Sequence, residues 1–488
     1  MTLFVDRRRE LDWLEERWKS GRAELLLVYG RRRVGKTRLV WEWMKGRRVF
    51  YFVAEEVPEQ RLLEKLSREL AEFAGDELLE ERPFTSWRQV FLYLARLAEN
   101  ERVGFVVDEF QYAAASSPGL LSTLQAVWDT RLSRTRALIL LMGSLVSFSE
   151  GVLSQRSPLY GRLTGVMRLQ PLGPLEARCF VPGWAPGDAL RLYGVFGGVP
   201  GYLAEVNPAE GLWENIERLL LRPNARFLDE ARYLLREGLR EVTRYYAVLE
   251  AIAGGATSYG GIASRSGIPG ESLSKYLRVL EEMGLVERVA PVIGRGRARY
   301  RVADRFLEFW FRYIPRHRAA IELGFSRRVV GAVKRDFEAS LAPRAWEEAL
   351  ASMVAAMARS RELDLVPTRM GPWWHRGMEI DLVAVDETVE PPRLLVAEAK
   401  WSELAAKEAR RELDKLRAKA QHLPAKPSHV TYVLAARALR GQPSLLPDER
   451  VLTLEDYERL SREACRPEPG ATSNSSWWLG LRGSLPAA

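Results

Sequence analysis

The feature that most constrains the fold lies between residues 24 and 44, where an apolar run leads into a glycine-rich loop and then into an amphipathic segment. The loop reads GRRRVGKT, from Gly30 to Thr37, and meets the spacing G-x-x-x-x-G-K-[ST] in full. Between a strand and a helix, the backbone N–H groups of such a loop surround phosphate oxygens. The stretch therefore predicts a nucleotide phosphate-binding loop in an α/β domain.

Each position of this loop has a chemical role. Gly30 and Gly35 permit backbone torsions that turn N–H groups toward phosphate, and the helix N-terminus adds its positive end. Lys36 places a charge on the β- and γ-phosphates, while the Thr37 hydroxyl is a ligand for Mg²⁺. The predicted nucleotide-binding residues of the loop are Gly30, Arg31, Arg32, Arg33, Val34, Gly35, Lys36, Thr37 and Arg38.

Five β-rich runs alternate with helical patterns between residues 24 and 172, which predicts a parallel sheet covered by helices on both faces. The runs are ELLLVYG, RVFYFVAE, VGFVVDEF, ALILLMGS and GVMRLQPL. The third ends in Asp108 and Glu109, so Asp108 is predicted to hold Mg²⁺ and Glu109 to polarise the attacking water. Ser144 ends the fourth run, and we expect it to sense the γ-phosphate unless it serves only the turn.

Composition limits the class of protein. The chain has 488 residues and 47% hydrophobic residues, which is enough for three or four packed domains. Its longest apolar run is far short of a membrane span, and its first residues lack a secretory pattern, so we expect a cytoplasmic protein without membrane contact. Two cysteines, Cys179 and Cys465, argue against a disulfide framework. A net charge of +9 suits a polyanionic partner, although 62 arginines against 11 lysines also fit a compositional bias.

Residues 173–235 show a helical pattern interrupted by GGVPGYL, and residues 236–315 read as a winged helix-turn-helix. In the predicted recognition helix, Ser272 is the expected cap, and Lys275 and Arg278 are expected to meet DNA. If the wing is a strand, its alternating arginines share one face that suits a phosphate backbone. These are Arg295, Arg297, Arg299 and Arg301. Contact with the protein's own core, or protection of a sheet edge, is the alternative use of this face.

A hairpin near the far end carries polar residues where apolar ones are expected. Asp381 lies between apolar residues in IDLVAV, and Glu398 and Lys400 share a face in LLVAEAK. Two carboxylates from adjacent strands can bind a divalent cation, to which Glu347 of the preceding helix could add a third ligand. Lys400 would orient the attacking water or stabilise the leaving charge. A structural lysine–glutamate network is the alternative.

The segments FVDRRREL, GRRRVGKT, VVDEFQY, the strand-end GS, SPLYGR and YGVFGGVPGYL together resemble the archaeal P-loop ATPase family, which groups with the AAA+ and STAND ATPases. Asp6 stands where that family has glycine. The resemblance implies ATP as ligand, with Arg7 and Pro200 near the adenine and Arg162 reading the γ-phosphate. If Arg162 acts on a neighbour, the protein is a homo-oligomer.

The C-terminal elements W-x-x-x-G-x-E-I-D and E-x-K-W resemble the domain of unknown function that follows these ATPases, and helix, hairpin, helix is the skeleton of the PD-(D/E)xK nuclease core. The predicted fold class is α/β: a P-loop sheet with a helical lid, a winged helix-turn-helix and a restriction-endonuclease-like domain. The expected segments are 1–172, 173–235, 236–315, 316–445 and a partly disordered tail, 446–488, with Trp477 and Trp478.

The sequence thus predicts a Mg²⁺-dependent ATPase that couples its nucleotide state to a DNA-binding winged helix and a nuclease-like domain. The alternative is a nucleotide-gated switch that binds a protein partner and carries an inactive nuclease-like scaffold.

Overall fold

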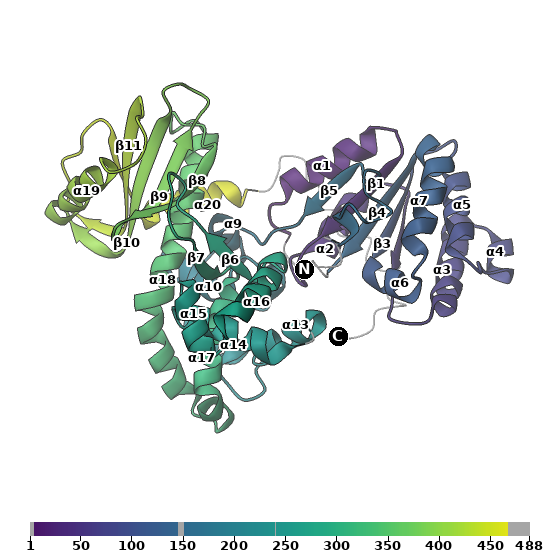
Figure 1. The fold of residues 1–488 in the computed structure, drawn as a ribbon, viewed down its shortest axis with the longest axis horizontal. Helices are drawn as coiled ribbons and strands as arrows, with labels where there is room; N and C mark the ends of the chain where they lie inside the picture. The colour runs from purple at the N-terminus through teal and green to yellow at the C-terminus, as the bar shows by residue number, and fades with distance from the viewer. Residues whose placement is uncertain (1–3, 145–150, 240, 467–488) are drawn as a thin grey trace.

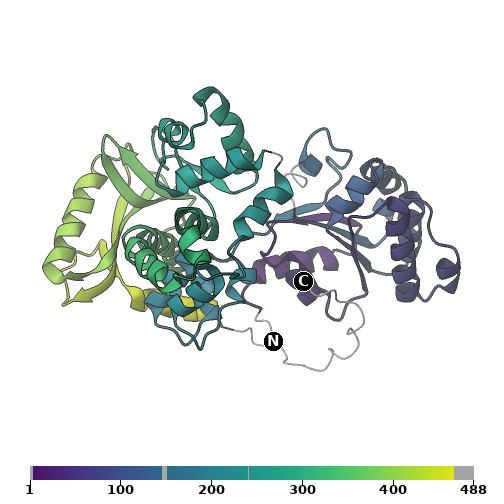
Figure 2. The same cartoon turned by 90° about the horizontal axis from the view of Figure 1, so that it is seen from below.

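The computed structural model describes residues 4–144, 151–239 and 241–466 (Figure 1). One β-sheet lies at each end of an elongated molecule, and helices fill the space between them (Figures 1 and 2). In the described ranges, no helix is long and apolar enough to cross a membrane. Trp477 and Trp478 of the predicted tail lie outside the described residues.

The N-terminal sheet has the strand order β2-β3-β4-β1-β5, and all its neighbouring strands run parallel. All five predicted strands are present: β1 (Glu24–Tyr29), β2 (Val49–Val53), β3 (Val103–Asp108), β4 (Ala137–Gly143) and β5 (Gly165–Arg168). Strands β1 and β4 are buried along their whole length, as expected of central strands covered on both faces. The fold class of this part is therefore confirmed.

Helices pack on both faces of this sheet, and each face has its own apolar core. They are α1 (Arg8–Lys19), α2 (Lys36–Met44), α3 (Glu59–Ala74), α4 (Glu77–Glu81), α5 (Trp87–Leu97), α6 (Phe110–Ser116), α7 (Leu120–Thr130) and the 3₁₀ turn η1 (Leu132–Arg134). The order β3-β4-β1 places the ends of β1 and β3 on either side of β4, so the phosphate loop and Asp108 meet at one edge of the sheet.

A helical segment follows the sheet. It contains α9 (Pro174–Ala177), the 3₁₀ turn η2 (Arg178–Phe180), α10 (Pro186–Phe196), α11 (Pro200–Leu203), α12 (Leu212–Leu220) and α13 (Glu230–Gly238). Three further helices and an antiparallel hairpin come next: α14 (Val242–Ala253), α15 (Tyr259–Ser266), α16 (Gly270–Glu282), β6 (Val286–Val289) and β7 (Arg299–Val302).

Two local predictions in this region are wrong. Ser272 does not cap α16, because the helix begins at Gly270 directly after Pro269 and Ser272 lies in its first turn. The four wing arginines do not form one strand face, because β7 begins only at Arg299 and residues 295–298 are irregular.

A second mixed sheet, of order β12-β11-β10-β9-β8, forms the C-terminal end. Strands β8, β9 and β10 pair antiparallel, whereas β10, β11 and β12 pair parallel. The elements are α17 (Arg305–Glu322), α18 (Ser326–Arg359), β8 (Arg369–His375), β9 (Met378–Asp386), β10 (Arg393–Ala405), α19 (Ala406–Ala420), β11 (His429–Arg440), β12 (Glu449–Leu452) and α20 (Leu454–Ala464). The expected tail from residue 446 is therefore too long, because β12 and α20 belong to this fold.

One continuous apolar core joins most of the elements after residue 174, and a separate core lies between α19 and the other face of the C-terminal sheet. Its buried side chains come from α9 to α13, from α14 to α16, from α17 and α18, and from one face of the C-terminal sheet. Leu175 near its start and Leu460 near its end belong to the same cluster. Because dense packing transmits displacement, we treat this part of the molecule, which we call the C-terminal body, as one mechanical unit.

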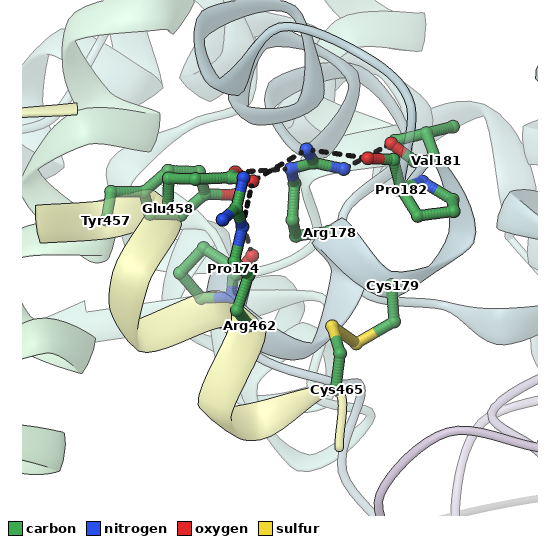
Figure 3. Close-up of a disulfide and its surroundings, with 9 residues drawn as sticks. All are labelled: Pro174, Arg178, Cys179, Val181, Pro182, Tyr457, Glu458, Arg462 and Cys465. Atoms are coloured by element: carbon green, nitrogen blue, oxygen red, sulfur yellow. Dashed lines mark hydrogen bonds and ion pairs between the residues drawn. A yellow bond between two sulfur atoms is a disulfide. The ribbon is translucent and has the colours of Figure 1, made fainter. Parts of the chain in front are cut away.

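A disulfide bond joins the two ends of the C-terminal body. Cys179 in η2 is bonded to Cys465, the residue after α20, across 286 positions of sequence (Figure 3). Beside it, the buried Arg178 donates to Glu458 of α20, with Nε 2.9 Å from Oε2. The sequence argued against a disulfide framework and did not predict this single bond, which forms because the packing of α20 against α9 brings the two cysteines together.

Candidate functional site

The phosphate loop lies between β1 and α2, as predicted. Gly35 has φ +99°, a torsion that favours glycine, and a Cβ on Gly30 would lie 2.6 Å from the Leu169 carbonyl oxygen. The buried Lys36 Nζ donates to the Gly30 carbonyl at 2.8 Å and lies 3.4 Å from that of Arg31. Burial lowers the Lys36 pKa, against the opposite effect of Glu109 and Asp108, while the Arg32 charge lowers it further.

Asp108, at the end of β3, faces the loop. The Thr37 hydroxyl donates to its Oδ2 at 2.9 Å, and the Tyr51 hydroxyl of β2 donates to the same oxygen. Burial and the neighbouring Asp108 charge raise the pKa of Tyr51 above its ordinary range. The sequence analysis missed Tyr51, because this residue lies in a strand of otherwise apolar residues. Only its polar hydroxyl group distinguishes it from its neighbours in the strand.

Glu109 is the N-cap residue of α6 and has a left-handed backbone, with φ +51°. Its Oε2 accepts hydrogen bonds from the Ser144 hydroxyl, at 2.7 Å, and from the side-chain amide of the buried Gln111. The structure thus brings Glu109 and Ser144 together, and it adds Gln111, which the sequence analysis did not single out. These two hydrogen bonds hold the left-handed backbone of Glu109 in place, and strained backbone held in this way is common at functional sites.

The donor set fits a nucleotide with Mg²⁺. The Thr37 hydroxyl and the Asp108 carboxylate are hard oxygen ligands within hydrogen-bond distance of each other. Lys36 is a buried cation whose partners are loop carbonyl oxygens, so an incoming phosphate would supply the missing negative charge. The close approach at Gly30 leaves no room there for a side chain.

Arg7 contacts the phosphate loop from outside, and Pro200 lies beside the loop. The buried Arg7 donates to the carbonyls of Val34, at 3.1 Å, and Gln170, at 2.7 Å. Asp6 before it has φ +52°, so the residue that replaces the family's glycine keeps the backbone a glycine would adopt. A Cβ on Gly35 would lie 3.9 Å from the Pro200 ring. The roles of Arg7 and Pro200 at the adenine stay predictions.

The segment GGVPG seats the helical region on the phosphate loop, which gives a testable consequence. Gly201 N donates to the Arg33 carbonyl at 3.0 Å, and a Cβ on Gly198 would lie 1.7 Å from the Leu172 carbonyl oxygen. Gly198→Ala is therefore expected to lower the unfolding free energy by about 1–3 kcal/mol. Gly183→Ala is the matched control, because nothing lies within 4 Å of its Cβ position. Equal melting temperatures in the two variants would contradict this.

The loop arginines have partners in the C-terminal body that sequence reasoning missed. Arg31 forms an ion pair with Asp304, the N-cap residue of α17, and donates to the Tyr202 hydroxyl at 2.9 Å. Arg33 pairs with Glu230 of α13, with Nε 2.8 Å from Oε1. Nothing in the local sequence reveals such distant partners.

Arg162 lies away from the phosphate loop of its own chain. It is held by Asp129 of α7, with Nη2 2.8 Å from Oδ2. Thr164, two residues later, donates to the carbonyl of Leu25 near the start of β1, whereas the phosphate loop follows the end of that strand. Arg162 therefore cannot read the γ-phosphate of its own chain in this structure, and only a role toward a neighbouring chain stays a prediction.

The predicted DNA-contacting residues fall into two groups. Lys275 and Arg278 are exposed on α16, with side-chain exposures of 60% and 73%. Arg295 and Arg297 are also exposed. Lys275 lies 4.0 Å from Glu241, and Arg278 lies 3.9 Å from Glu282. Arg299 and Arg301 pair more closely, each at 2.8 Å, with Glu379 and Glu287, and Arg299 also covers the Trp374 ring. Arg299 and Arg301 thus form contacts within the chain, which is the alternative that the sequence left open.

The C-terminal carboxylates form a row from α18 across β9 to β10. Burial, then the Asp381 charge, raises the Glu347 pKa to about 7; burial, then Glu398, raises that of Asp381 to about 6. Glu398 is paired with Lys400, at 2.9 Å, and with Lys419 of α19, at 3.0 Å. Within the described ranges, no group of three or more His, Cys, Asp or Glu side chains is arranged to hold a metal ion. The three carboxylates are therefore neighbours that do not form a metal site in the described residues. The sequence analysis did not identify Lys419 as a partner of Glu398.

Comparison with known proteins identifies two family models. Residues 4–206 match a family described as an ATPase domain predominantly from Archaea. Residues 310–412 match a family described as archaeal and bacterial proteins of unknown function. An uncharacterised protein of Methanocaldococcus jannaschii is 30% identical over 416 residues, which cover 84% of this chain and 90% of that protein.

Solved structures that match this chain include the Walker-type ATPase of Pyrococcus abyssi, at 21% identity. That match covers 63% of this chain and 96% of the other, with a TM-score of 0.47. The Aeropyrum pernix ORC2 protein, solved as ADPNP–ADP complexes, is 17% identical over 64% of this chain and 95% of the other, with a TM-score of 0.41.

Proposed function

Because the chain belongs to the archaeal P-loop ATPase family, we propose that it is a Mg²⁺-dependent ATPase whose nucleotide state controls DNA binding by residues 242–302. The observation that carries the proposal is the meeting of Lys36, Thr37, Asp108 and Glu109 at one edge of the sheet. Direct contacts join this edge to the C-terminal body, which carries α16.

Each of these side chains has a task in hydrolysis. Thr37 and Asp108 would hold Mg²⁺, which neutralises phosphate charge when bound. Lys36 binds the phosphates, and Glu109 accepts a proton from the attacking water. Ser144 and Gln111 orient the Glu109 carboxylate, since both donate to its Oε2.

The region proposed to bind DNA has the element order of a winged helix: three helices followed by a two-stranded hairpin. Two basic residues of α16, Lys275 and Arg278, and two of the loop before β7, Arg295 and Arg297, are exposed. Such cations suit contact with phosphates, which raises affinity and makes it sensitive to salt.

Fluorescence anisotropy with labelled duplex DNA tests this face. Arg295→Ala/Arg297→Ala and Lys275→Ala/Arg278→Ala are each expected to weaken binding about 10-fold or more at low salt and to flatten its salt dependence. Arg61→Ala/Arg68→Ala removes two exposed arginines of α3 and is the matched control. Wild-type protein that binds no DNA would favour the alternative, a nucleotide-gated switch for a protein partner.

Metal-dependent cleavage of nucleic acid is a second candidate function, favoured by the row of Glu347, Asp381 and Glu398 beside Lys400. The order α18, β8, β9, β10, α19, β11 supports a nuclease-like core, with the hairpin carboxylates on adjacent antiparallel strands. A divalent cation would stabilise the charged forms of Glu347 and Asp381, whose pKa values are raised first by burial and then by the neighbouring carboxylate charge. The pairing of Glu398 with Lys419 favours the other possibility, an inactive scaffold.

Incubation of linear and branched DNA with Mg²⁺ or Mn²⁺, with and without ATP, separates these two possibilities. Asp381→Ala is expected to abolish cleavage, and Lys36→Ala to remove its dependence on ATP. Absence of metal-dependent cleavage on every substrate, with ATP turnover intact, would leave the C-terminal domain as a scaffold.

A further inference from the structure

Two arginines of the phosphate loop have acidic partners outside the ATPase sheet. Arg31 pairs with Asp304 at the start of α17, and Arg33 pairs with Glu230 at the start of α13. We call these two ion pairs and the Tyr202 hydroxyl between them the loop clamp. Tyr202 accepts from Arg31 at 2.9 Å and donates to Glu230 at 3.3 Å.

The loop clamp is largely shielded from water. The side-chain exposures are 15% for Arg31 and 7% for Asp304, against 33% for Arg33 and 8% for Glu230. Both arginines also cover the Tyr202 ring, at 5.5 and 5.9 Å from its centroid. Charge pairs in such surroundings are screened less than surface pairs. A second negative group that approaches the arginines would therefore change the strength of these pairs.

A nucleotide would bring negative charge to the same loop. Arg31 and Arg33 lie within the eight-residue motif that surrounds the phosphates, and Lys36 is bound to the carbonyls of Gly30 and Arg31. The carboxylates of Asp304 and Glu230 neutralise positive charge that phosphates would otherwise attract. A bound nucleotide and the two carboxylates would therefore compete for the positive charge of the same loop.

We propose that Asp304 and Glu230 are positioning residues that hold the phosphate loop in a low-affinity state, and that nucleotide binding releases α13 and α17 from the loop. The inference deepens the proposed function, because it names the contact through which nucleotide state reaches the C-terminal body. It requires nucleotide binding alone and holds with or without a DNA partner. By linkage, the factor by which the clamp weakens nucleotide binding equals the factor by which bound nucleotide weakens the clamp.

The contacts continue beyond the clamp. Arg305, next to Asp304, is buried and donates to Glu308 at 2.6 Å and to Glu348 of α18. Glu348 adjoins Glu347, the first carboxylate of the C-terminal row. Release of the first turn of α17 would therefore act on packed charged residues that extend to the second candidate site.

Substitutions at the acidic partners test the clamp. Asp304→Asn keeps the side-chain oxygen that accepts from Leu307 N and caps α17, yet it removes the charge facing Arg31. Glu230→Gln keeps an acceptor for Tyr202. Each variant is expected to bind a fluorescent ADP analogue about 5-fold more tightly than wild type, and the double variant more tightly than either. Asp76→Asn, the same change at the N-cap of α4, is the matched control.

Hydrogen exchange of the full chain gives the reciprocal readout. ADP is expected to speed amide exchange in residues 304–309 and 230–234 of wild type, and to have little further effect there in the double variant. Unchanged or weaker ADP binding in Asp304→Asn and Glu230→Gln would overturn the inference, because a merely structural clamp would weaken binding. Wild type that binds no ADP would overturn the proposed function itself.

Discussion

Glu109→Gln is expected to reduce ATP turnover about 100- to 10,000-fold while ADP binding is retained. A glutamine cannot accept the proton of the attacking water, although it fills the same space beside Ser144 and Gln111. Steady-state phosphate release at saturating ATP measures the first effect, and equilibrium binding of a fluorescent ADP analogue measures the second.

Glu72→Gln supplies the control, because Glu72 is an exposed residue of α3 and receives the same chemical change. Turnover of Glu109→Gln within about 3-fold of wild type would remove Glu109 from the role of general base. Loss of ADP binding together with turnover would show that Glu109 shapes the nucleotide site instead.

Loss of the disulfide is expected to lower the unfolding free energy by about 2–5 kcal/mol. The bond closes 286 positions of sequence, for which the chain-entropy model gives an upper value of about 5–6 kcal/mol, and the expected loss is smaller because the unfolded chain retains some structure. It ties η2, at the start of the C-terminal body, to the end of α20 (Figure 3). Urea unfolding followed by tryptophan fluorescence compares wild type with Cys179→Ser/Cys465→Ser.

Reductant provides the internal control for this prediction. Wild type in dithiothreitol should unfold at the urea concentration of the double variant, and the double variant should not respond to reductant. Wild type of equal stability with and without reductant would contradict a stabilising role for the bond.

Local motifs made the nucleotide site predictable. The loop from Gly30 to Thr37 and the strand ending in Asp108 carry their chemistry within a few residues, and apolar runs determine the strands on which they lie. Ser144 could be found in the same way, because it directly follows β4. The parallel order of the strands then brings these ends together.

Contacts between distant segments were not predictable from one sequence. The partners of Arg31 and Arg33 lie 273 and 197 positions away, and Lys419 reaches Glu398 from a different element. The two cysteines meet through the packing of α20 on α9. Such pairings depend on tertiary packing, which neither spacing nor periodicity encodes.

Alternation was also a weaker guide than expected in the wing. Gly294 and Gly296 precede β7, so the arginines before residue 299 have no strand to align them. Arg299 and Arg301, which do lie in the strand, are paired with carboxylates. The run of arginines therefore predicted a basic segment correctly, but it did not predict how the side chains are arranged.

We propose that ATP hydrolysis at the phosphate loop is coupled to DNA binding by the C-terminal body. The most direct test of this coupling is the rate of ATP turnover with Mg²⁺, with and without duplex DNA, over a range of salt, beside Lys36→Ala as the inactive reference. DNA is expected to stimulate ATP turnover at low salt, and to do so progressively less as the salt concentration rises. Turnover that is present in wild type and indifferent to DNA at every salt concentration would contradict it.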